Sequence, residues 1–160
     1  MKGQEMTRIV RTTADILYPF SMVFGCYIVA HGHLTPGGGF QGGAVMATAT
    51  ALLIVAHRYD RIAQRIRKPR MKLFEAAGLM GILLTGATAL FIGRPFLQNW
   101  LANSGHPLFG DAVAYGANPG DLNTAGLVPI MNIAVGIEVL GALTLILLYM
   151  LSGLQEENTK

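Results

Sequence analysis

Four long apolar runs separated by polar segments constrain this chain more than any other feature of its sequence. They cover about residues 12–30, 40–57, 73–92 and 127–151. The hydrocarbon core of a bilayer is about 30 Å thick, so about 20 consecutive apolar residues in a helix cross it. Buried soluble helices can also be apolar all round, but four such runs in 160 residues leave almost no other chain to bury them. The sequence therefore predicts an all-α integral membrane protein, a single membrane domain over residues 1–160 with four transmembrane helices.

The composition excludes several other classes of protein. Only 13% of the residues are charged, against about 25% in an ordinary soluble domain. The single cysteine, Cys26, rules out a disulfide framework and any multi-thiolate metal site built by this chain alone. A net charge of +3 does not indicate a nucleic-acid partner, because the basic residues lie between apolar runs and not on a soluble module. We expect no bound cofactor and no enzymatic activity in this chain itself, although a parent complex could be a redox enzyme.

The positive charges predict an orientation in the membrane. Eleven of the 12 Lys and Arg residues fall on one side of the predicted membrane, and seven of them lie in the segment 58–72. Only Arg94 falls on the other side. By the positive-inside rule both termini and residues 58–72 are cytoplasmic, and residues 94–126 form an external loop with Trp100 as an interface anchor. The protein is then a multi-pass protein of the cell membrane, the inner membrane where a cell has two. The basic segment is also suited to anionic membrane lipid.

Small residues at a spacing of four predict how the spans pack. Such spacing permits close approach of two helices in lipid. The predicted contact stripes are Gly43, Ala47 and Ala51, and Ala77, Gly81 and Thr85 with Thr88 beside them. On the last span the residues that cluster on one face are Ala134, Glu138, Gly141 and Ala142. A chain this small, with contact faces on three spans, is expected to dock in a larger membrane assembly.

Glu138 is the sharpest functional candidate. It lies 11 residues beyond the start of the last span, about 16 Å along a helix and hence near the middle of the bilayer. Ionisable groups at that depth are costly and usually face a protein interior or a water path. Two interpretations stay open, an ion or proton relay and an acid that only joins helices. Asn132, six residues earlier, lies about 120° around the helix and need not share the surroundings of Glu138.

Two further acids are ion-path candidates near the cytoplasmic ends of their spans. Asp15 lies close to the predicted start of the first span and Glu75 in the first turn of the third, where the helix dipole favours an acid whatever its function. Pro19, four residues after Asp15, has no N–H to donate to the Asp15 carbonyl. A carboxylate and a free carbonyl therefore coincide, which suggests a cation station.

A glycine-rich segment between the first two spans is the remaining signal. It contains His31 and a motif loop of Gly32, His33, Pro36, Gly37, Gly38, Gly39 and Phe40. Proline ends a helix, and successive glycines permit backbone geometry closed to other residues. The segment is either a tight turn or an unwound loop whose carbonyls face a cation or a neighbouring helix. Two histidines without a third ligand fall short of a metal site, so none is expected.

Several of these segments resemble the B-type subunits of the multisubunit Mrp-type (Mnh) cation/proton antiporters. The similar segments are Gly32-His33, Pro36 to Phe40, Gly42-Gly43, Gly93 to Leu97, Pro107 to Gly110 and the apolar last span, within about residues 9 to 151. Counterparts of this family occur in membrane-bound hydrogenases and related ferredoxin-dependent complexes. Members often carry an acid near the start of the last span, where Asn132 stands here. Glu138 is then a shifted acid.

The resemblance implies an integral subunit of a sodium/proton antiporter module, stand-alone or within a redox-driven pump. It would assemble with other small Mrp-like membrane subunits and with large antiporter-like subunits, or with hydrogenase-type redox subunits, and would contribute to the cation path or its scaffold. Two alternatives remain: a purely structural membrane scaffold and an independent small channel.

Overall fold

The computed structural model describes residues 6–35, 37–113 and 121–157, and these residues form helices joined by turns, with no strand among them. The helices are α1 (Arg8–Ala30), α2 (Gly38–His57), α3 (Tyr59–Ala63), α4 (Lys68–Phe91) and α5 (Val128–Glu157). Four of them, α1, α2, α4 and the Val128–Gly153 part of α5, are long and apolar enough to cross a membrane. The predicted all-α membrane fold and its four spans are therefore confirmed.

Local chemistry explains where these helices begin. The Thr7 side chain accepts a hydrogen bond from the Val10 N–H, which caps the start of α1. Pro69 occupies the first turn of α4, where a missing N–H costs nothing. The helices α1, α4 and α5 extend beyond the predicted spans because their polar flanks, including Arg8 and Lys68, continue the helix outside the apolar run. The short helix α3 was not predicted, since the basic segment was expected to be a loop.

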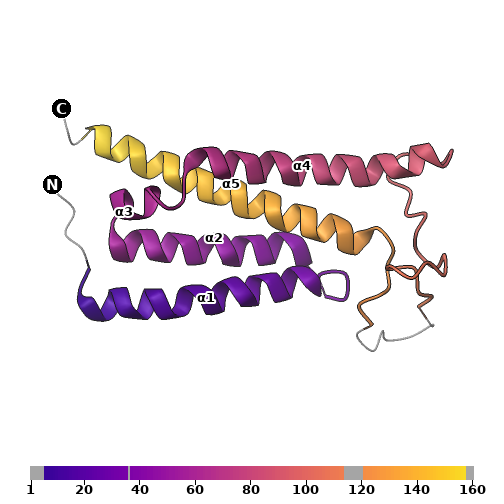
Figure 1. The fold of residues 1–160 in the computed structure, drawn as a ribbon, viewed down its shortest axis with the longest axis horizontal. Helices are drawn as coiled ribbons and strands as arrows, with labels where there is room; N and C mark the ends of the chain where they lie inside the picture. Colours follow the sequence, from indigo (N-terminus) through magenta and orange to yellow (C-terminus); the bar gives the residue numbers. More distant parts are fainter. Residues whose placement is uncertain (1–5, 36, 114–120, 158–160) are drawn as a thin grey trace.

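The four long helices lie side by side in one row, in the order α1, α2, α5, α4 (Figure 1). The two central helices, α2 and α5, are more buried than the outer helices α1 and α4. Large apolar side chains cover the outward faces of α1 and α4 and are exposed, for example Phe20, Val23, Leu84 and Phe91. A row of this kind buries little of its own apolar surface, so these faces are available to lipid or to other subunits.

Small residues bring the backbones together at each interface in the row. A Cβ added at Gly25 would overlap Met46 of α2, and one added at Gly43 would meet Val139 of α5. The predicted stripe on α4 is wrong at Ala77, which is exposed. Its neighbour Gly78 is buried against α5 instead, whereas Gly81 faces Ala134 of α5 and Thr85 is buried, so the prediction fails at one position of three.

The segment between α4 and α5 packs back onto the ends of these two helices. The Leu97 N–H donates to the Gly86 carbonyl, and the Trp100 indole N–H donates to the Thr88 hydroxyl at 3.0 Å. Asn99 joins the segment to the start of α5 through the Ala125 carbonyl and the Leu127 N–H. These bonds hold the described part of the loop at the end of the row opposite α3 (Figure 1).

Candidate functional site

Glu138 lies at the interface of α4 and α5, ten residues into α5 and therefore about 15 Å from the start of that helix. Gly78 of α4 faces it: a Cβ added at Gly78 would overlap the Glu138 Cβ. The side chain is half-buried. Within the described part of the chain its carboxyl group makes no hydrogen bond or ion pair. Glu138 thus has the mid-helix position predicted for it, and no described cation neutralises it.

Glu75 belongs to the same interface, about one turn away from Glu138 along α4. Gly78 follows Glu75 by three residues, and Gly141, three residues after Glu138, approaches the backbone of Glu75. The prediction that Glu75 lies in a first turn is wrong, because α4 begins at Lys68 and has no acid in its first turn. The helix dipole therefore does not account for this residue. The structure instead brings two half-buried acids to one helix–helix contact.

Asn132 faces the other side of α5, toward α2 and the turn before it. Its side-chain amide lies against Gly32, and its backbone lies against Gly39. The amide nitrogen is enclosed but finds no hydrogen-bond partner in the part of the chain that the structure describes. Asn132 and Glu138 therefore lie in different surroundings.

The motif loop is a tight turn followed by the first turn of α2. The Leu34 N–H donates to the His31 carbonyl, and Gly37 adopts the left-handed conformation (φ 90°) just before the helix starts. Gly38 and Gly39 are helical and buried, and Phe40 is exposed. Gly38 packs directly on the backbone of Gly32. Pro36 lies outside the described residues.

The interpretation of this segment as an unwound loop is therefore wrong for Gly38 to Phe40. Their carbonyls enter the α2 helix, which begins earlier than predicted because Gly37 supplies the backbone reversal. His33, by contrast, has both ring nitrogens enclosed without a hydrogen-bond partner among the described residues. Buried polar atoms of this kind normally have a partner. His33 and Asn132 thus mark an enclosed polar region beside the turn.

Asp15 lies in a different place, at the end of the row that carries α3. Its carboxylate is 2.7 Å from the Nε2 atom of His57, the last residue of α2. His57 is 12% exposed and Asp15 57%. Asp15 lies about two turns inside α1, because that helix begins at Arg8 and not near residue 12. Pro19 lies inside α1 as predicted, where it cannot donate to the Asp15 carbonyl.

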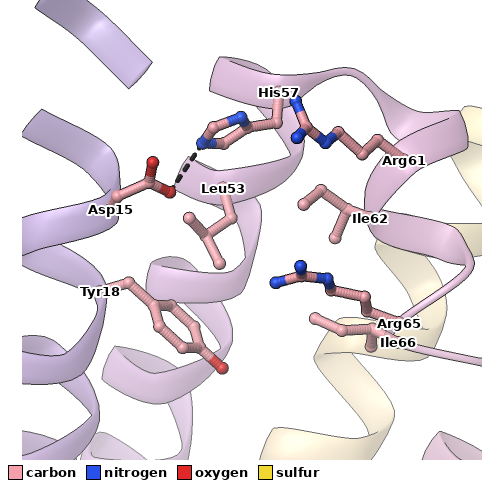
Figure 2. A pocket seen from close by; sticks show the side chains of 8 residues that line it. All are labelled: Asp15, Tyr18, Leu53, His57, Arg61, Ile62, Arg65 and Ile66. Atoms are coloured by element: carbon pink, nitrogen blue, oxygen red, sulfur yellow. Dashed lines mark hydrogen bonds and ion pairs between the residues drawn. The ribbon is translucent and has the colours of Figure 1, made fainter. Parts of the chain in front are cut away.

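The Asp15–His57 pair opens onto a cavity of about 450 Å³ (Figure 2). Tyr18 and Leu53 line one side, and residues of α3 and the turn after it line the other. His57 and this cavity were missed at the level of sequence. Since Asp15 and His57 both lie near one end of two antiparallel neighbouring spans, the predicted topology alone could have placed them at the same depth.

No cluster suited to a metal ion occurs in residues 6–35, 37–113 and 121–157, where no three or more His, Cys, Asp or Glu side chains gather. The four predicted ion-path residues therefore fall into three separate places. Glu138 and Glu75 share the α4–α5 interface, Asn132 lies by the motif turn, and Asp15 pairs with His57. Carboxyl and imidazole groups can carry protons and a carboxylate can balance a cation, whereas the Asn132 amide can only donate and accept hydrogen bonds.

Comparison with known proteins links this arrangement to ion-transporting membrane complexes. Residues 9–145 match the family described as a domain related to the MnhB subunit of Na+/H+ antiporter. The B-type subunit of a Na+/H+ antiporter from Bacillus subtilis is 33% identical over 112 residues, which cover 69% of this chain and 77% of that protein. An uncharacterized protein of Methanocaldococcus jannaschii is 37% identical over 140 residues, covering 88% of this chain and 50% of its own length.

A solved structure has the same fold. A chain of the membrane-bound sulfane sulfur reductase, an archaeal respiratory membrane complex, superposes with a TM-score of 0.72 at 35% sequence identity. The match covers 94% of this chain and 60% of that chain. This chain therefore spans about half to three fifths of the length of these two archaeal relatives.

Proposed function

Because this chain belongs to the family of domains related to the MnhB subunit of Na+/H+ antiporters, we propose that it is an integral subunit of a sodium/proton antiporter module and contributes to its cation path. Its partners would be other small Mrp-like membrane subunits and large antiporter-like subunits. The complex would lie in the cell membrane. The basic end of the row, with α3, the start of α1 and the end of α5, would face the cytoplasm.

The single observation that carries this proposal is that the Glu138 carboxyl group lies about 15 Å along α5 and has no partner among the described residues. A carboxylate near mid-bilayer is costly by several kcal/mol unless water or a cation compensates it. Gly78 leaves room for the helices to approach closely, and no described residue pairs with the acid. A carboxyl group placed there is suited to hold a proton or to balance a passing cation.

A second observation favours a place in a larger assembly. The helices form a single row with exposed apolar faces on α1 and α4 (Figure 1). The similar chain in a respiratory membrane complex supports such a place. A redox-driven pump with hydrogenase-type or related subunits is therefore as compatible with the fold as a stand-alone antiporter. In either complex this chain would be a non-catalytic subunit.

Glu138→Gln tests the proposal in the assembled complex. Glutamine keeps the shape and hydrogen-bonding capacity of the side chain but cannot ionise. We expect unchanged assembly and sodium-dependent proton transport that falls by roughly an order of magnitude or more, because the group can no longer carry a proton or balance a cation. Asp111→Asn, which neutralises an exposed acid of the loop before α5, is the matched control and should leave transport unchanged.

Two results would separate the alternatives. Normal transport in a fully assembled Glu138→Gln complex would exclude the relay role and favour a structural scaffold, in which case Glu138→Leu should damage assembly. Sodium transport by the purified chain alone, reconstituted in vesicles, would instead favour an independent channel.

A further inference from the structure

The enclosed polar region beside the turn before α2 contains side-chain atoms that lack hydrogen bonds. Both ring nitrogens of His33 and the amide nitrogen of Asn132 are enclosed, and none of the three has a partner among the described residues. An enclosed polar atom without a hydrogen bond is costly. In native proteins such atoms are normally bonded to other protein groups or to ordered water. Three of them in one region therefore indicate a bound molecule.

Close backbone contacts bring these side chains to the first turn of α2. The Asn132 amide nitrogen lies beside Gly32, where an added Cβ would come within 2.8 Å of it, and His33 directly follows Gly32 in the chain. Gly32 packs on Gly38, and Gly39 packs on the Asn132 backbone. The turn after α1 and the start of α5 lie at the same end of the row (Figure 1). The imidazole, the amide and the start of α2 thus belong to one small region.

The first turn of α2 adds further donors to this region. The N–H groups at the start of a helix have no partner within the helix, and Gly37, the residue before α2, provides no side-chain cap. Gly38 and Gly39 are buried at this start. Their N–H groups and the Asn132 amide can donate to an oxygen atom, whereas a neutral imidazole has one nitrogen that accepts. A molecule that both accepts and donates would satisfy these groups together.

The absence of charge in the adjoining helices favours a neutral ligand. No Asp, Glu, Lys or Arg occurs in the parts of α1, α2 and α5 near the turn, residues 16–30, 38–56 and 128–137. Glu138, the next residue of α5, faces α4 instead. An enclosed ion needs a countercharge, whereas a buried water molecule is neutral and makes about three hydrogen bonds.

We propose that His33, Asn132 and the first turn of α2 bind internal water. The water oxygen accepts from the Asn132 amide or from an N–H group of α2, and a water O–H group donates to the accepting nitrogen of His33. This direction follows from the donors and acceptors that the region offers. The inference does not depend on the transport role of Glu138.

A double-mutant cycle, measured by thermal unfolding of the full-length chain in detergent, tests the proposal. His33→Phe keeps a planar ring and Asn132→Leu keeps an apolar side chain of similar size, but neither can form hydrogen bonds. Each single variant should unfold several degrees lower, because the water and the remaining side chain lose a partner. The double variant should lose clearly less than the sum of the two single losses.

His31→Phe is the matched control for this cycle. Its ring is bonded to the Tyr27 carbonyl and stacks on the Tyr27 ring, two residues before His33. The effects of His31→Phe and Asn132→Leu should therefore add. Removal of an enclosed polar atom that truly has no partner is neutral or stabilising. An unchanged or higher melting temperature in both single variants at His33 and Asn132 would overturn the proposal, as would losses that simply add in their double variant.

A measurement on the unsubstituted chain does not require the variants to fold. In lipid vesicles, solid-state NMR follows the transfer of magnetisation from water to the ¹⁵N-labelled histidine rings. The enclosed ring of His33 should receive this signal as early as the His31 ring, because a water molecule is bonded to it. A delay equal to that of apolar side chains in the buried core would contradict the water site.

Discussion

At the scale of single residues, the polar groups of this chain are distributed over different helix faces. Asn132 and Glu138 belong to the same helix, yet Asn132 meets the turn before α2 and Glu138 meets α4. Two side chains six residues apart on a helix point about 120° away from each other, so they contact different neighbours when the helix lies inside a row. The central position of α5 therefore lets one helix present polar groups to two separate interfaces.

Gly38 supports the most specific prediction at this scale. Gly38→Val should destabilise the protein by about 1–3 kcal/mol or more, because its Cβ would overlap the backbone of Gly32 and a β-branched side chain cannot relieve the clash by rotation. Leu34→Val, a change of one methylene in the same turn, should cost less than about 1.5 kcal/mol. Thermal unfolding and the yield of assembled complex measure both. Equal yields from the two variants would show that the turn is a passive linker.

At the scale of elements, the contact between α4 and α5 depends on glycines that face each other across it. Gly78 receives Glu138, and Gly141 receives the backbone of α4 near Glu75. Without a hydrophobic force between helices in lipid, such close approach supplies the packing energy. The two acids therefore lie on a contact whose geometry the glycines determine.

Gly78→Ala tests this contact. The added methyl group would overlap the backbone nitrogen and the Cβ of Glu138, so we expect a loss of about 1–3 kcal/mol in stability and weaker transport. Gly153→Ala is the matched control, because nothing lies within 4 Å of that position. It should be neutral or stabilise α5 by about 0.5–1 kcal/mol. A thermal shift of the same size and sign in both variants would contradict the packing role.

The elements themselves followed from the sequence because an apolar run of the right length has few other solutions. Their ends did not, since Arg8 and Lys68 are as compatible with a helical extension as with a loop. Asp15 and Glu75 therefore lie about two turns inside their helices and not close to the helix starts. Contact faces were predicted with an error of one residue at Ala77, because both Ala77 and Gly78 are small. The Asp15–His57 pair required knowledge of which spans are neighbours, which spacing within one helix does not contain.

At the scale of the whole molecule, the basic segment and the other connecting segments lie at opposite ends of the row of helices. The segment with α3 carries most of the basic residues at one end, and the turn before α2 and the segment before α5 lie at the other (Figure 1). The broad faces of α1 and α4 are apolar. A thin, flat element of this kind is suited to sit between larger membrane subunits, with its ends in the two aqueous phases.

This separation predicts the orientation, with the basic end in the cytoplasm. In a Cys26→Ser background, needed because the native thiol is exposed, we would introduce a cysteine at Val113 in the segment before α5 or at Gln64 after α3, both exposed positions. An impermeant thiol reagent added to intact cells should label the variant at Val113 and not the one at Gln64. Permeabilised cells, in which both should be labelled, control for accessibility. Labelling at Gln64 alone would reverse the orientation and place the end of the row with α3 on the external side.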